Sequence, residues 1–109
     1  MKIVLTGGSG YIGSVTTELL CDDGHEVVVF DNLERGHREA VDPRARLVVG
    51  DLREPLAIRE LLAAVRPDAV VHFAAYALVG ESMQNPHLYF ENNVGGGLNL
   101  LDAMLRAGV

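Results

Sequence analysis

The sequence of 109 residues is poor in cysteine, in lysine and in long apolar runs, and each shortage excludes a class of protein. Cys21 is the only cysteine, so an intrachain disulfide cannot form and a reducing compartment is expected. No apolar run approaches the roughly 20 residues that a membrane-spanning helix needs. Met1 and Lys2 lead directly into a strand-like segment, which is unlike a signal peptide. We therefore expect a cytoplasmic protein with no membrane partner.

Positive charge is also scarce. The chain has 9 lysines and arginines against 15 acidic residues, a net charge of -6, which argues against a nucleic-acid partner. The four histidines and Cys21 lack the spacing of a metal site, so no metal is expected. Hydrophobic residues make up 49% of the chain, which is enough for a packed core, and the length suits one domain over residues 1–109.

Short β-branched runs alternate with segments of helical periodicity, such as Ile12, Val15 and Leu19, and this pattern predicts a parallel α/β sheet. Strands are expected at 3–5, 26–30, 46–50 and 69–73, helices at 11–22, 55–66 and from about 86 or 92 to 106, and loops at 31–46 and 74–85. Right-handed crossovers give the strand order 3-2-1-4. The fold class is therefore a Rossmann-type doubly wound sheet, of which about half is present.

Three glycines separate the first strand from the first helix in the pattern G-x-x-G-x-x-G. Gly7 permits a tight turn off the strand, Gly10 lets the backbone approach a pyrophosphate, and Gly13 allows close helix packing. The N-terminus of the helix offers unpaired N–H groups and a partial positive charge to phosphates. An acidic protein can thus bind an anionic dinucleotide without a basic patch.

Two carboxylates follow strands at the same edge of the sheet. Asp31 can accept hydrogen bonds from the adenosine ribose and repel a 2′-phosphate, which favours NAD over NADP, or it can simply open a turn. Arg35 and Arg38 lie nearby and leave NADP open. Asp51 can bond the adenine amino group or act as the N-cap of the next helix. The small residues Ala74 and Ala75, after Phe73, would let a cofactor lie against the backbone.

Five segments of the chain resemble the UDP-glucose 4-epimerase family of extended short-chain dehydrogenases/reductases. They are TGGSGYIGS from Thr6, DNLERGHREAV from Asp31, GDLR from Gly50, HFAAYALVGESMQNP from His72 and YFENNVGGGLNLLDAM from Tyr89. This resemblance covers essentially the whole chain. It implies a bound NAD, a UDP-sugar substrate, a homodimer, and interconversion of UDP-galactose and UDP-glucose by transient oxidation at C4 of the sugar.

The resemblance also implies which residues contact the cofactor. Tyr11 and Ile12 would contact the pyrophosphate, and Asp51 and Leu52 would flank the adenine. The residues expected around the ribose are Asp31, Asn32, Leu33, Arg35 and Gly36, and those expected along the middle of the cofactor are Phe73, Ala74, Ala75, Tyr76 and Asn92.

The catalytic pair of that family, Tyr-x-x-x-Lys, is missing, because Lys2 is the only lysine. The lysine would lower the pKa of the tyrosine that serves as acid and base. We therefore expect no catalytic residue here: the chain is an N-terminal, cofactor-binding portion that is inactive alone. Two alternatives stay open, namely another extended-family enzyme acting on nucleotide sugars (a dehydratase or reductase) and a stand-alone dinucleotide-sensing module.

Two features of the last helix carry further expectations. Leu98, Leu101 and Leu105 form an apolar stripe that is most simply a core face, and the resemblance adds a role in a dimer interface. Three consecutive glycines, Gly95 to Gly97, stand where the family has usually one. Each extra glycine costs about 1 kcal/mol relative to alanine, so a weaker helix is expected.

Overall fold

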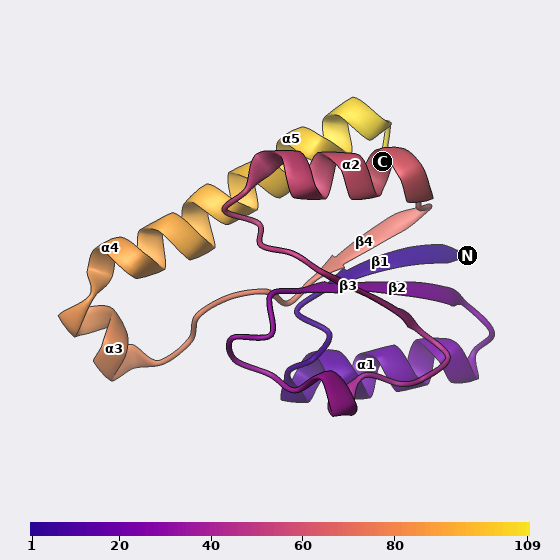
Figure 1. Ribbon diagram of the computed structural model, residues 1–109, viewed down its shortest axis with the longest axis horizontal. Helices are drawn as coiled ribbons and strands as arrows, with labels where there is room; N and C mark the ends of the chain where they lie inside the picture. Colours follow the sequence, from indigo (N-terminus) through magenta and orange to yellow (C-terminus); the bar gives the residue numbers. More distant parts are fainter.

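The computed structural model describes residues 1–109 as a three-layer α/β sandwich (Figure 1). Its strands are β1 (Lys2–Thr6), β2 (Glu26–Asp31), β3 (Arg46–Val49) and β4 (Ala69–His72). Its helices are α1 (Tyr11–Asp22), the short η1 (Arg38–Ala40), α2 (Pro55–Val65), α3 (Val79–Gln84), α4 (Pro86–Tyr89), the π-helical η2 (Phe90–Gly95) and α5 (Gly96–Ala107). The expected order of the four strands and of the helices that begin near residues 11 and 55 is confirmed.

The four strands form one parallel sheet in the order β3-β2-β1-β4, as the crossover rule predicts. Thr6 of β1 pairs with Phe30 of β2 on one side and with His72 of β4 on the other, so the strands end together. In Figure 1 the loops that follow the strands, together with α3 and α4, lie beyond this carboxyl edge. In open parallel sheets this edge is where ligands bind.

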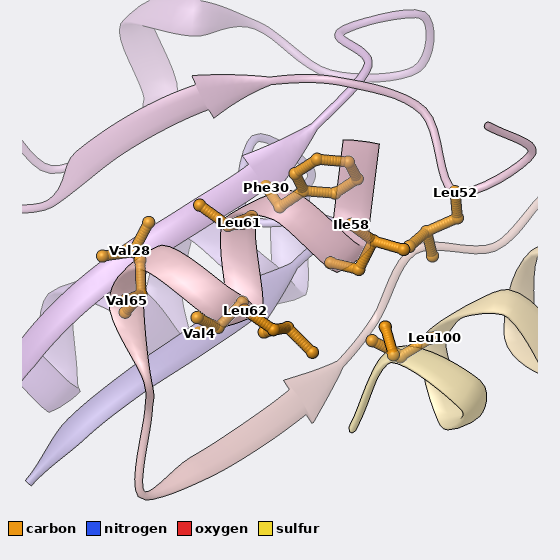
Figure 2. Close-up of a cluster of buried hydrophobic side chains, with 10 residues drawn as sticks. Val4, Val28, Phe30, Leu52, Ile58, Leu61, Leu62, Val65 and Leu100 are labelled. Carbon is orange, nitrogen blue, oxygen red and sulfur yellow. The ribbon is translucent and has the colours of Figure 1, made fainter. Parts of the chain in front are cut away.

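Both faces of the sheet are covered, which explains why the strands are continuous apolar runs rather than alternating ones. Val4, Val28 and Phe30 point toward α2 and α5, where they join the larger core cluster (Figure 2). The helix residues in that cluster are Ile58, Leu61, Leu62, Val65, Leu100 and Ala103, and Leu52 joins it from the loop after β3. Leu5 and Val29 belong to a smaller cluster on the opposite face, the side of α1.

The expectation of a loop at 74–85 is wrong in its second half, because Val79–Gln84 form α3. The helix has only 6 residues and no buried ones, so it shows no amphipathic period that the sequence could reveal. Its start is fixed instead by a long-range contact, in which the Leu78 amide donates to the hydroxyl of Tyr89 at 3.0 Å.

The expectation of a core face at Leu98, Leu101 and Leu105 is also wrong. These side chains are 61%, 62% and 81% exposed, whereas Leu100 and Ala103 are buried. Helix α5 packs against α2 with the face that carries Leu100 and Ala103, and its leucine stripe points away from the core. In α1 likewise, Gly13 and Thr17 are buried while the apolar residues that predict the helix are exposed.

Candidate functional site

An open groove runs along the carboxyl edge of the sheet, between the glycine loop and the segments that follow β2, β3 and β4. Its lining residues are Gly7, Gly10, Phe30, Asp31, Asn32, Arg35, Gly36, Gly50, Asp51, Leu52, Phe73, Ala74, Ala75, Tyr76 and Asn92. The groove brings together 13 of the 17 residues that the sequence proposes for cofactor contact.

The four that do not line the groove are Tyr11, Ile12, Gly13 and Leu33. The side chains of Tyr11 and Ile12 are 87% and 62% exposed, and these residues begin α1 with no side-chain cap on their helix terminus. Phe30 and Gly50 line the groove although the sequence does not indicate them. A glycine directly after a strand is the only available signal, and a Cβ at Gly50 would lie 2.5 Å from the ring of Phe30.

The glycine loop forms one wall of the groove, and its glycines differ in how much space a side chain would find there. Gly7 has φ +77, and a Cβ there would lie 2.6 Å from the amide nitrogen of Ala74. A Cβ at Gly13 would lie 2.1 Å from the carbonyl oxygen of Gly7, so this glycine allows α1 to pack on the turn. Gly10 differs, because its Cβ would meet only that same oxygen, at 3.6 Å. The protein's own packing therefore does not require a glycine at Gly10.

Asp31 links the glycine loop to the segment after β2. One carboxylate oxygen accepts from the amide of Ser9 at 2.9 Å, and the other accepts from the amide of Leu33 at 2.8 Å. The second bond shows that Asp31 does open a turn, and it supports the left-handed backbone of Leu33 at φ 63. Each oxygen has a further lone pair, so the same carboxylate can still accept from a ligand hydroxyl.

Asp51 is not the N-cap of α2, because that position belongs to Glu54. Its carboxylate instead accepts from the backbone amide of Arg53 at 2.9 Å, from the Arg53 guanidinium at 2.6 Å, and from the side-chain amide of Asn32 at 3.2 Å. The hydrogen bonds from Arg53 lower the pKa of Asp51 to about 2. Asp51 therefore joins the segments after β2 and β3, and its ionised carboxylate is paired with the guanidinium of Arg53.

Tyr76 closes the groove from the segment after β4. Its backbone is fixed on both sides by Asn93, whose side-chain oxygen accepts from the Tyr76 amide and whose nitrogen donates to the Tyr76 carbonyl, each at 2.9 Å. The buried Tyr76 hydroxyl donates to Glu34, and burial followed by that bond raises the pKa of Tyr76. The guanidinium of Arg35 lies 4.4 Å above the ring and pairs with Glu81.

This arrangement is suited to an elongated anionic ligand with hydroxyl groups. It offers a helix N-terminus for phosphates, a carboxylate for hydroxyls, and close backbone approach at Gly10. Nowhere do three or more histidine, cysteine, aspartate or glutamate side chains gather as a metal ion would require. No helix combines the length and the apolar character that crossing a membrane requires.

Comparison with known proteins identifies the family of this chain. The sequence profile of the "NAD dependent epimerase/dehydratase family" matches residues 3–109. A UDP-glucose 4-epimerase of Lacticaseibacillus casei is 49% identical over 109 residues, covering 100% of this chain and 33% of the relative. One of Klebsiella pneumoniae is 44% identical, with 100% of this chain and 84% of the relative covered.

Solved structures agree with the sequence relatives. The crystal structure of Thermus thermophilus UDP-glucose 4-epimerase in complex with NAD superposes with a TM-score of 0.97 at 43% identity. That comparison covers 100% of this chain and 35% of the solved one. The chain thus spans about a third of the length of most of these relatives, and the Rossmann-type fold with four parallel strands is shared with them.

Proposed function

Because the chain belongs to the NAD dependent epimerase/dehydratase family, we propose that it binds NAD in the groove as the cofactor-binding part of a UDP-glucose 4-epimerase. The observation that carries this proposal is the contact between Asp31 and the amide of Ser9, at 2.9 Å. That bond sets a ribose-binding carboxylate next to a phosphate-binding glycine loop, which is the spacing that a dinucleotide needs.

The residues present fit that cofactor. The pyrophosphate would lie against Gly10 and the amides that begin α1, where Tyr11 and Ile12 contribute backbone rather than side-chain contacts. The adenosine ribose would bond to Asp31 and lie against Asn32, Arg35 and Gly36. The further contacts proposed are Leu33 at the ribose, Asp51 and Leu52 at the adenine, and Phe73, Ala74, Ala75, Tyr76 and Asn92 toward the middle of the cofactor.

NAD is the expected cofactor rather than NADP, because Asp31 would repel a 2′-phosphate. Titration of the protein with each dinucleotide by isothermal titration calorimetry tests this. We expect NAD to bind at least about tenfold more tightly, which corresponds to 1.4 kcal/mol. The Asp31→Ala variant should reduce the ratio of NAD affinity to NADP affinity. Tighter binding of NADP by the wild-type chain would refute the assignment, and binding of neither would refute the site.

In the whole enzyme, bound NAD would take up and return the hydride of the sugar C4. The acid and base of that reaction would come from outside these 109 residues, because a Tyr-x-x-x-Lys pair cannot be formed with Lys2 as the only lysine. We therefore expect the 109-residue chain to bind NAD without converting UDP-galactose to UDP-glucose. A coupled assay for UDP-glucose tests this, and turnover by the purified chain would contradict it.

A homodimer in the whole enzyme is the expected assembly, and the exposed leucine stripe of α5 is the surface proposed for it. Leu98, Leu101 and Leu105 are all more than 60% exposed, and they lie on one side of the helix. Exposed apolar surface of this kind is typical of a protein–protein contact.

A further inference from the structure

Arg35 is the only arginine that lines the groove, and its guanidinium is already occupied. Its two terminal nitrogens donate to the two carboxylate oxygens of Glu81, at 2.5 Å and 3.2 Å. The pair is bidentate, with 40% of the Arg35 side chain and 28% of the Glu81 side chain exposed. Glu81 itself does not line the groove, since it reaches Arg35 from α3, which lies beyond the carboxyl edge of the sheet (Figure 1).

The position of Arg35 would otherwise suit a 2′-phosphate. It stands in the loop after β2, four residues beyond the ribose-binding Asp31, and an arginine in this region is what accommodates the 2′-phosphate of NADP in dinucleotide-binding folds. A guanidinium binds phosphate and carboxylate with the same planar, two-pronged geometry. Glu81 therefore offsets the charge of Arg35 and engages both of its terminal nitrogens, which a phosphate would also use.

The surroundings hold Arg35 in this pair. Its guanidinium stacks 4.4 Å above the ring of Tyr76, whose backbone is fixed by Asn93, so the side chain is held from two directions. The hydrogen bond from Arg35 also keeps the pKa of Glu81 below its usual range, as is typical of a carboxylate paired with a guanidinium. Glu34 adds a second negative charge nearby, bound to the Tyr76 hydroxyl and to Arg53.

We propose that Glu81 is a specificity-determining residue for the cofactor, because it neutralises Arg35 and withholds its guanidinium from a 2′-phosphate. This inference rests on the proposed NAD function. Glu81 would thus add to the repulsion of NADP by Asp31 a second cause of discrimination against NADP, although Glu81 lies 46 positions from Arg35 in the chain.

The experiment is a set of titrations with NAD and NADP in the full chain. In Glu81→Gln, Arg35 keeps its place and loses its charged partner, so we expect NADP to bind about tenfold more tightly, which corresponds to about 1.4 kcal/mol. The affinity for NAD should stay within about threefold of wild type, because NAD carries no 2′-phosphate. The double variant Glu81→Gln/Arg35→Gln should lose the gain.

A matched control separates this effect from a general change of charge. Glu60→Gln removes the same charge from an exposed residue of α2 that does not contact Arg35 or line the groove, and it should leave both affinities unchanged. A ratio of NADP to NAD affinity that stays within twofold in Glu81→Gln overturns the proposal. So does an equal change in both affinities, which would indicate a purely structural role.

A second measurement does not depend on the folding of that variant. Arg35→Gln in the otherwise wild-type chain should change the affinities for NAD and NADP by the same factor, because a neutralised arginine gives NADP no contact that NAD lacks. A larger loss for NADP alone would show that Arg35 already binds the 2′-phosphate, and would overturn the proposal. Failure of the wild-type chain to bind either dinucleotide would instead refute the proposed function.

Discussion

Substitution of Gly10 by alanine should separate ligand binding from folding. The backbone of Gly10, with φ -81 and ψ 179, is open to any residue, and the new methyl would touch only the Gly7 carbonyl oxygen, at 3.6 Å. Gly10 is the N-cap of α1, so the loss in free energy of unfolding should be about 1 kcal/mol or less. For a domain of this size that corresponds to a fall in Tm of at most about 8 °C.

The affinity for NAD should fall far more than the stability does. The methyl group would occupy the surface proposed for the pyrophosphate, and a lost phosphate contact of at least about 1.4 kcal/mol weakens binding tenfold or more. Thermal melts followed by circular dichroism give the stability, and calorimetric titration gives the affinity. Unchanged NAD binding by Gly10→Ala would refute the placement of the pyrophosphate at this loop.

Gly13→Ala provides the matched comparison three residues along. Its methyl would lie 2.1 Å from the carbonyl oxygen of Gly7 and 2.8 Å from the Cα of Gly8, and both are backbone atoms. The loss of stability should therefore reach about 3 kcal/mol, the upper end for overpacking. Equal destabilisation by the two variants would contradict the geometry described for the loop.

Three further predictions concern other parts of the chain. Gly97→Ala should raise the free energy of unfolding by about 0.5–1 kcal/mol in urea titrations, whereas Gly96→Ala should not, because its Cβ would lie 3.1 Å from that of Leu52. Leu101→Gln changes a residue that is 62% exposed on the proposed dimer surface, so in the whole enzyme it should weaken the dimer in sedimentation without altering the circular dichroism spectrum. The pKa of Asp51 falls from 3.8 to about 2 on folding, so its stabilisation is present above pH 4 and lost as the pH drops toward 2. Acid titrations of Asp51→Asn should lack this component, and an unchanged acid transition would count against the ion pair.

Local sequence determined the strands, the longer helices and the spacing of the glycine loop. The interior of a strand such as β2, with the run VVVF, is apolar because both faces of the sheet are covered, and this pattern is visible without a structure. Gly7, Gly10 and Asp31 follow strands whose carboxyl ends meet at one edge, so their proximity follows from the strand order.

Tertiary contacts decided what spacing alone cannot. The structure excludes Asp51 as the N-cap of α2, because its carboxylate instead binds the side chains of Arg53 and Asn32, and its contact with an adenine stays a prediction. The partner of Arg35 lies 46 residues away on a helix with no periodic signal, so no local pattern could indicate Glu81.

The buried face of α5 is another feature that the sequence leaves open and the tertiary structure decides. Periodicity correctly predicts a helix, but two faces of it carry apolar residues, and the sequence does not say which one meets the core. Leu100 and Ala103 are buried because α5 packs closely on α2 and Leu52, which favours the small side of the helix. The leucine stripe remains exposed. The sequence by itself determined the strands, the longer helices and the residue types at their ends, while packing decided which surfaces are buried and which charges are paired.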